Sequence, residues 1–247
     1  MMELIREASP QLKARIAGVF YLLIFAVGSF AEFFVRGRLV VYGDAAATAT
    51  NILAHQSLYR LGGAADLITL TCDISVALIF YDLLKPVSRS LSLFAAVFRL
   101  VFVAMMAVNS LNYFVPLAIL KGAHFLTAFN TDQLQALALV SLQSYGTGYD
   151  IALVFFGFHC LLIGHLIFRS VFLPRILGVL MAFSGLGWLT FLWPPLANYL
   201  HPYVLLPGVL GEGSLTLWLL VMGVNTQRWN EQASTAREMA VVARHAL

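Results

Sequence analysis

The sequence places carboxyl groups inside segments that are otherwise apolar. Asp66 and Asp73 both lie in the apolar run 60–84. They are seven residues apart, so two helical turns separate them and they point nearly the same way, with Thr69 on the same face. A charged side chain at such a place is costly and normally faces a bundle interior or a water-filled cavity. The pattern is typical of the wall of a polar cavity, or of neutralised carboxyl groups that hydrogen-bond between helices.

Other apolar runs carry candidate partners for these two acids. Acidic groups from separate helices can form one layer, open to the outside of the membrane, that binds a cation or accepts protons. We therefore predict that six residues bind a small molecule or ion, in a protein of transporter or sensor type: Glu32, Asp66, Asp73, Asp150, Glu212 and Asn112. Whether all of them point inward depends on helix rotations that the sequence leaves open.

A second hypothesis is a metal centre formed by Asp73, His159 and Glu212. Carboxylates and imidazole suit zinc or another divalent ion. A water bound to that ion would attack the substrate, which makes the protein a metal-dependent intramembrane hydrolase acting on a lipid-like substrate. The chain has no His-Glu-x-x-His, Gly-x-Ser-x-Gly or Gly-rich phosphate motif to support this chemistry. A lone histidine in an apolar run is more often a hydrogen-bonded packing residue than a ligand.

A third hypothesis is a structural or assembly partner without a site, so the residues leave open whether the protein is an enzyme. Arg99 lies in a further apolar run, and its guanidinium stays charged in nearly any setting. We expect it to reach toward the membrane surface or to form an ion pair with Asp73 or Asp82.

The composition predicts the kind of fold that positions these residues. Of the 247 residues, 60% are hydrophobic and 11% are charged, against roughly 25% charged in a soluble domain. A helix needs roughly 20 mostly apolar residues to cross a bilayer. We predict an all-α, polytopic membrane helix bundle in one domain, with the bilayer as its partner, six spans and a polar tail: 16–35, 60–84, 91–120, 148–168, 176–193, 205–224 and 225–247. The net charge of +3 does not favour nucleic acid as a partner, and the oligomeric state stays open.

Two connections between the spans contain additional helical patterns. Asp44 can cap a helix over 45–56, and Thr131 can cap one over 132–144. We predict two amphipathic helices at the outer surface, which either cap the bundle or cover an outward-facing cavity.

The distribution of basic residues predicts the orientation. Ten Lys and Arg side chains fall on the side of the two termini, and four fall on the other side. Because cytoplasmic segments carry the excess of Lys and Arg, we predict that both termini are cytoplasmic. The ten are Arg6, Lys13, Arg15, Lys85, Arg89, Arg169, Arg175, Arg228, Arg237 and Arg244, and the four are Arg36, Arg38, Arg60 and Lys121.

Three stretches also resemble a known family. Residues 31–51 read AEFFVRGRLVVYGDAAATATN, residues 148–180 read GYDIALVFFGFHCLLIGHLIFRSVFLPRILGVL, and residues 211–224 read GEGSLTLWLLVMGV. Together they resemble the bacterial family called domain of unknown function 4386, over roughly 14–224. The resemblance implies a multi-pass protein of the bacterial or archaeal cytoplasmic membrane. It implies no activity and assigns no catalytic residue.

Overall fold

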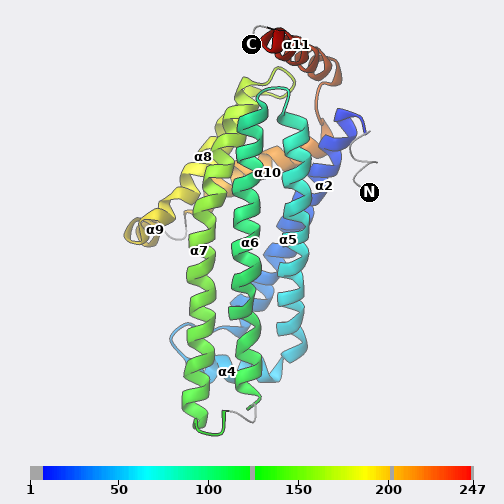
Figure 1. Cartoon of the computed structure of the whole chain (residues 1–247). Helices are drawn as coiled ribbons and strands as arrows, with labels where there is room; N and C mark the ends of the chain where they lie inside the picture. Colours follow the sequence, from blue (N-terminus) through cyan, green and yellow to red (C-terminus); the bar gives the residue numbers. More distant parts are fainter. Residues whose placement is uncertain (1–7, 123–125, 201–202, 246–247) are drawn as a thin grey trace. The chain divides into compact units, whose positions relative to one another are not determined.

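The computed structural model describes residues 8–122, 126–200 and 203–245, with side chains as far as residue 239. All regular structure in these ranges is helical (Figure 1), which confirms the predicted all-α class. Many large apolar side chains point outward, among them Val108, Leu217 and Val221, whose exposed fractions exceed 60%. Such side chains pack favourably against the lipid tails of a bilayer, whereas their exposure to water is unfavourable.

The helices are longer than most of the predicted spans. The first helical stretch runs without interruption from Pro10 to Leu39. It consists of an α-helix, a π-helical segment and a final short α-helical segment. The elements are α2 (Pro10–Ser29), η1 (Phe30–Arg36), α3 (Gly37–Leu39), α4 (Ala45–Ala54), α5 (Gln56–Leu84), α6 (Arg89–Leu120), α7 (Thr131–Arg169), α8 (Arg175–Leu189), η3 (Thr190–Leu192), α9 (Pro194–Leu200), α10 (Leu205–Val221) and α11 (Thr226–His245).

The number of helices able to cross a membrane agrees with the prediction. Five helical stretches in the described ranges are long and apolar enough. A sixth span results if α9 and α10, which are bent by 78° relative to each other, count as one. The chain is therefore a membrane protein with five or six apolar helices that can span a bilayer.

One of the two predicted surface helices does not exist as a separate element. The segment 132–144 is the first third of α7, which continues for 39 residues. Gly146 and Gly148 do not interrupt it, because a glycine in a helix interior costs only about 1 kcal/mol and Leu142 and Tyr145 beside them are buried. The cap is Asn130 instead of Thr131, since Asn130 and Gln133 exchange hydrogen bonds of 2.9 and 3.0 Å between side chain and backbone.

The other surface helix forms where the sequence predicts it. The Asp44 carboxylate accepts a hydrogen bond of 2.8 Å from the N–H of Ala47 and so caps α4. Thr48, Ala49 and Ile52 form the buried face of this helix.

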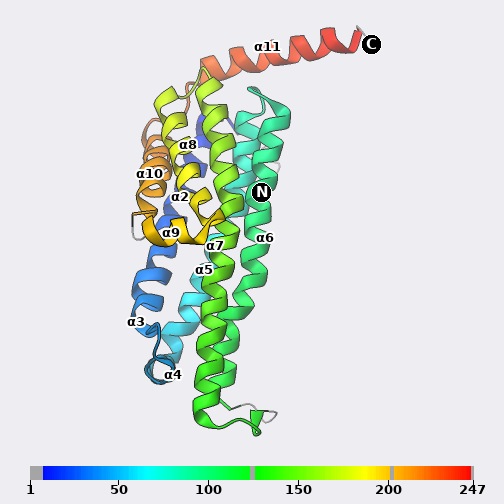
Figure 2. The same ribbon diagram turned by 90° about the vertical axis from the view of Figure 1, so that its left-hand side faces the viewer.

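The chain divides into two compact units, and the division falls inside α2, α5, α6 and α7. Unit 1 comprises Met1–Leu22, Asp73–Phe102 and Leu153–Leu247, and unit 2 comprises Leu23–Cys72 and Val103–Ala152. In each unit, parts of α5, α6 and α7 run side by side (Figures 1 and 2).

In unit 1, α7 and α8 approach closely along a seam of glycines. A Cβ on Gly164 would lie 2.7 Å from the carbonyl oxygen of Gly178, and one on Gly185 would lie 2.8 Å from that of Gly157. Small residues at these positions let two membrane helices pack backbone against backbone. The seam fixes the α8 side chains that contribute to the polar interior of this unit.

Candidate functional site

The interior of unit 1 contains a fully buried arginine. Arg99 of α6 is 0% exposed. Its Nε and Nη2 atoms donate to one carboxylate oxygen of Asp73 on α5, at 2.9 and 2.5 Å, and its Nη1 atom donates to the hydroxyl of Tyr21 on α2 at 2.7 Å. The predicted ion pair between Arg99 and Asp73 is thus confirmed. Asp82, the other partner considered, binds Lys13 and Lys85 instead.

His159 of α7 completes this group, which we call the Arg99 cluster: Tyr21, Asp73, Arg99 and His159. The Nδ1 atom of His159 lies 2.8 Å from the carbonyl oxygen of Ala95, and Nε2 lies 3.1 Å from Nη1 of Arg99. A carbonyl only accepts and a guanidinium only donates. The imidazole is therefore the neutral tautomer with its proton on Nδ1, and His159 acts as a hydrogen-bonded packing residue.

Glu212 of α10 is buried in the same unit but has different partners. One of its carboxyl oxygens accepts hydrogen bonds from Ser184 Oγ at 3.0 Å and Trp188 Nε1 at 2.9 Å, both on α8. Gly211 lets α10 lie close against α8, because a Cβ at this position would clash with the carbonyl oxygen of Leu180. Glu212 is 7% exposed. It forms no ion pair with any residue that the structure describes, although Arg99 and Asp73 are near enough to interact with it electrostatically.

The side chains considered as metal ligands are not arranged as a metal centre. Asp73 and His159 both point at Arg99, so a guanidinium takes the place where an ion would sit between them. Among the described residues, no three His, Cys, Asp or Glu side chains form a group that could hold a metal ion. The arrangement of Asp73, His159 and Glu212 therefore does not favour the predicted metal site, because a cationic side chain already neutralises the acid.

Unit 2 contains a second arginine with two acids, and 11% of the arginine side chain is exposed. We call this group the Arg36 cluster: Glu32, Arg36, Asp66 and Tyr145. Arg36 donates to Asp66 and to Glu32, each at 2.7 Å, and the Tyr145 hydroxyl donates to the same oxygen of Asp66 at 3.0 Å. The guanidinium also lies 5.3 Å from the centre of the Tyr145 ring. The charge distribution along the sequence places Arg36 only among the four outer basic residues. Its spacing of four residues from Glu32 is the signal that could have revealed the pair.

The other two candidates in unit 2 lie away from this pair. The Asn112 amide donates to Asn109 Oδ1 at 3.0 Å. Both asparagines line an open groove of about 380 Å³ with Gln143, Ser144 and Thr147. Asp150 is exposed on α7. It interacts electrostatically with the exposed Tyr42, whose pKa is raised by partial desolvation and by the nearby carboxyl groups of Glu32 and Asp150.

The structure thus places the six candidate residues in two sets. Asp73 and Glu212 belong to unit 1, and Glu32, Asp66, Asn112 and Asp150 belong to unit 2. Asp66 and Asp73 share a face of α5, as the spacing predicts, yet each is paired with an arginine of its own unit. Most of these acids therefore bind side chains of the chain itself.

Comparison with known proteins extends these observations. The model of the family described as domain of unknown function (DUF4386) matches residues 16–223. A protein of Archaeoglobus fulgidus described as uncharacterized is 28% identical over 170 residues, which cover 68% of this chain and 85% of that protein. No solved structure matches. Because the family model covers most of the chain, including every residue of both arginine clusters, this protein belongs to the DUF4386 family.

Proposed function

We propose that this membrane protein binds and releases a proton at Glu212, beside the fixed ion pair of Arg99 and Asp73, as part of a proton-linked transporter or sensor. The observation that carries the proposal is the set of partners of Glu212. A carboxyl group buried in an apolar helix is held there by two neutral donors, Ser184 and Trp188. It can change its protonation state without breaking an ion pair.

The neighbouring charges support this assignment of roles. Asp73 and Arg99 neutralise each other through two hydrogen bonds, so neither can take part in proton exchange without leaving a buried charge unpaired. The Arg36 cluster in unit 2 is held in the same way. Intramembrane acids of this kind commonly mark proton relays in pumps and transporters.

We propose a proton site in place of the outward-facing acidic cavity that the sequence predicts. Two cavities of about 270 and 380 Å³ in the described residues are lined by other side chains, and of the candidate residues only Asn112 lines one of them. A proton needs no cavity, whereas a larger ligand does. We retain the predicted orientation as part of the proposal, with both termini in the cytoplasm because ten of fourteen peripheral Lys and Arg lie on that side.

Infrared difference spectroscopy of the full chain in lipid bilayers tests the proposal. We expect a carboxyl C=O band that appears and disappears as pH is changed, that is absent in Glu212→Gln, and that persists in Glu231→Gln. Glu231 is the matched control because it is an exposed carboxyl group on α11. If Glu212→Gln leaves all titrating bands unchanged, Glu212 does not exchange protons, and a structural or assembly role becomes the better explanation.

A further inference from the structure

A cavity of about 270 Å³ lies in unit 1 between the connection of α5 to α6 and the end of α7. Its lining combines apolar, hydroxyl and basic side chains: Val87, Ser88, Leu91, His165, Leu166 and Arg169. None of these residues belongs to the Arg99 cluster or contacts Glu212 through a hydrogen bond. We infer that this cavity binds the phosphate group of an anionic lipid or of a soluble phosphate.

The two basic side chains point to an anion. His165 and Arg169 are four residues apart on α7 and so lie on one face of the helix. Neither forms a hydrogen bond or ion pair through its side chain with any described residue, whereas Arg36 and Arg99 are both paired with acids. A cation that lines a cavity without a partner attracts a negative group, and guanidinium matches the geometry of a phosphate through two parallel hydrogen bonds.

The hydroxyl of Ser88 adds a third polar group. Its oxygen accepts a hydrogen bond of 3.4 Å from the N–H of Leu91, which leaves its proton to be donated to a phosphate oxygen. Arg169 can only donate to a ligand, the Ser88 hydroxyl has its proton to donate, and His165 donates where it presents an N–H. This set favours an anion over a cation or an uncharged sugar.

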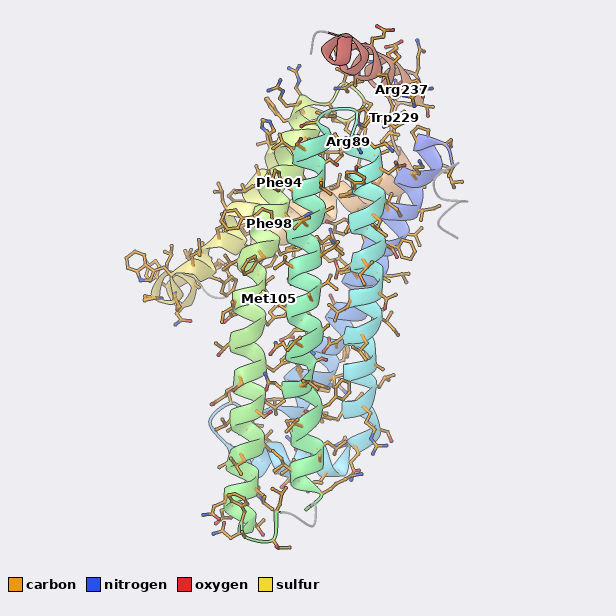
Figure 3. The ribbon with its side chains drawn as sticks, viewed as in Figure 1. Arg89, Phe94, Phe98, Met105, Trp229 and Arg237 are labelled. Atoms are coloured by element: carbon orange, nitrogen blue, oxygen red, sulfur yellow. The ribbon has the colours of Figure 1, made fainter. Side chains whose placement is uncertain are left out.

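The position of the cavity along the helices favours a lipid as the source of the phosphate. Arg169 is the last residue of α7, and Ser88 directly precedes the first residue of α6. The ends of spanning helices lie at the level of the headgroups. Along α6, Arg89 stands at the start and Phe94 and Phe98 follow (Figure 3). Phe94 is 58% exposed, so the lipid-covered surface begins little more than one turn from Arg89.

Native mass spectrometry of the full chain in mild detergent tests the inference. The protein is freed of lipid and titrated separately with phosphatidylglycerol, phosphatidylcholine and sodium phosphate. The variant is Arg169→Gln, and the matched control is Arg237→Gln, which removes an equal charge from exposed α11 (Figure 3). Arg169 is exposed and has no partner to lose, so this variant is expected to fold normally. Unchanged thermal unfolding of both variants verifies that point.

We expect wild-type protein and Arg237→Gln to bind phosphatidylglycerol alike, and Arg169→Gln to bind it about tenfold more weakly or worse, since one charge-assisted hydrogen-bonding group is lost. Binding of sodium phosphate but not phosphatidylglycerol, with the same dependence on Arg169, supports the phosphate site and assigns it to a soluble ligand. Equal binding of each ligand by wild type and Arg169→Gln overturns the inference, as does an equal loss in both variants.

Discussion

Both arginine clusters neutralise acids within apolar helices, but they differ in how deeply the charged side chains are buried. In unit 2, Arg36 balances two acids, and the side chain of one of them, Glu32, is 57% exposed. In unit 1, Arg99 is 0% exposed and balances Asp73 alone, while the nearby Glu212 has only neutral donors. The surplus acid of unit 2, Glu32, is therefore left largely exposed, whereas that of unit 1, Glu212, is enclosed, as the proposed proton site requires.

Replacement of Arg99 is expected to have the largest effect. Arg99→Met leaves Asp73 buried without a cation, and breaking a buried ion pair costs about 3–5 kcal/mol. The measurement is the free energy of unfolding in mixed detergent micelles. The double variant Arg99→Met with Asp73→Asn is the control, and it should recover part of the loss because no uncompensated charge remains. If the double variant is as unstable as the sum of the two single variants, the pair is not the source of the effect.

Replacement of Arg36 should have a smaller effect in the same assay. Arg36→Met also removes the cation from Asp66, but that carboxylate keeps the hydrogen bond from Tyr145, and its side chain is 14% exposed. We expect a loss of about 1–3 kcal/mol. A loss as large as that of Arg99→Met would show that the two clusters do not differ in effective burial.

Replacement of Glu212 tests the role of the two neutral donors that bind its carboxyl group. The amide oxygen of Glu212→Gln can still accept from Ser184 and Trp188, so we expect the free energy of unfolding to change by less than about 1 kcal/mol. Glu212→Leu serves as the comparison. It should cost about 1–3 kcal/mol, because two buried donors lose their acceptor. Equal stability of the two variants would contradict the hydrogen-bonding role assigned to this carboxyl group.

The smallest effect is expected at Glu32. Glu32→Gln removes an ion pair with Arg36 whose acid is largely exposed, and such pairs contribute about 0–1 kcal/mol. Arg36 keeps Asp66 as its partner. Raising the salt concentration should reduce even this difference. A loss above that of Arg36→Met would mean that Glu32, and not Asp66, is the main partner of the arginine.

The sequence predicted the helical segments well because apolar length determines which segments can cross a bilayer. It also offered Asp73 as one of two possible ion-pair partners of Arg99, since two opposite charges in neighbouring apolar helices have few other ways to be neutralised. The boundary near Gly146 and Gly148 was wrong because local composition does not show that Leu142 and Tyr145 are buried. Tertiary packing of these side chains outweighs the weak helix propensity of glycine.

The partners of the candidate acids were harder to predict. The donors of Glu212 are Ser184 and Trp188 on α8, and their approach depends on the rotation of α10 about its own axis. The contact of Arg36 with Asp66 on α5 likewise depends on how two helices are rotated, and Arg36 ends the π-helical segment Phe30–Arg36, where the backbone spacing departs from 3.6 residues per turn. Neither rotation nor a local change of helix type is encoded in hydrophobic periodicity, so the helices were predictable and the contacts among their polar side chains largely were not.

The fixed tautomer of His159 makes this residue a reporter of its surroundings. Its two ring nitrogens face a carbonyl and a guanidinium, so each nitrogen senses a different neighbour. In protein labelled with nitrogen-15 at histidine, the two ring resonances should therefore be well separated. A shift of the Nε2 resonance alone would signal that Arg99 has moved, so rearrangement of the buried charges can be followed by magnetic resonance at one natural residue.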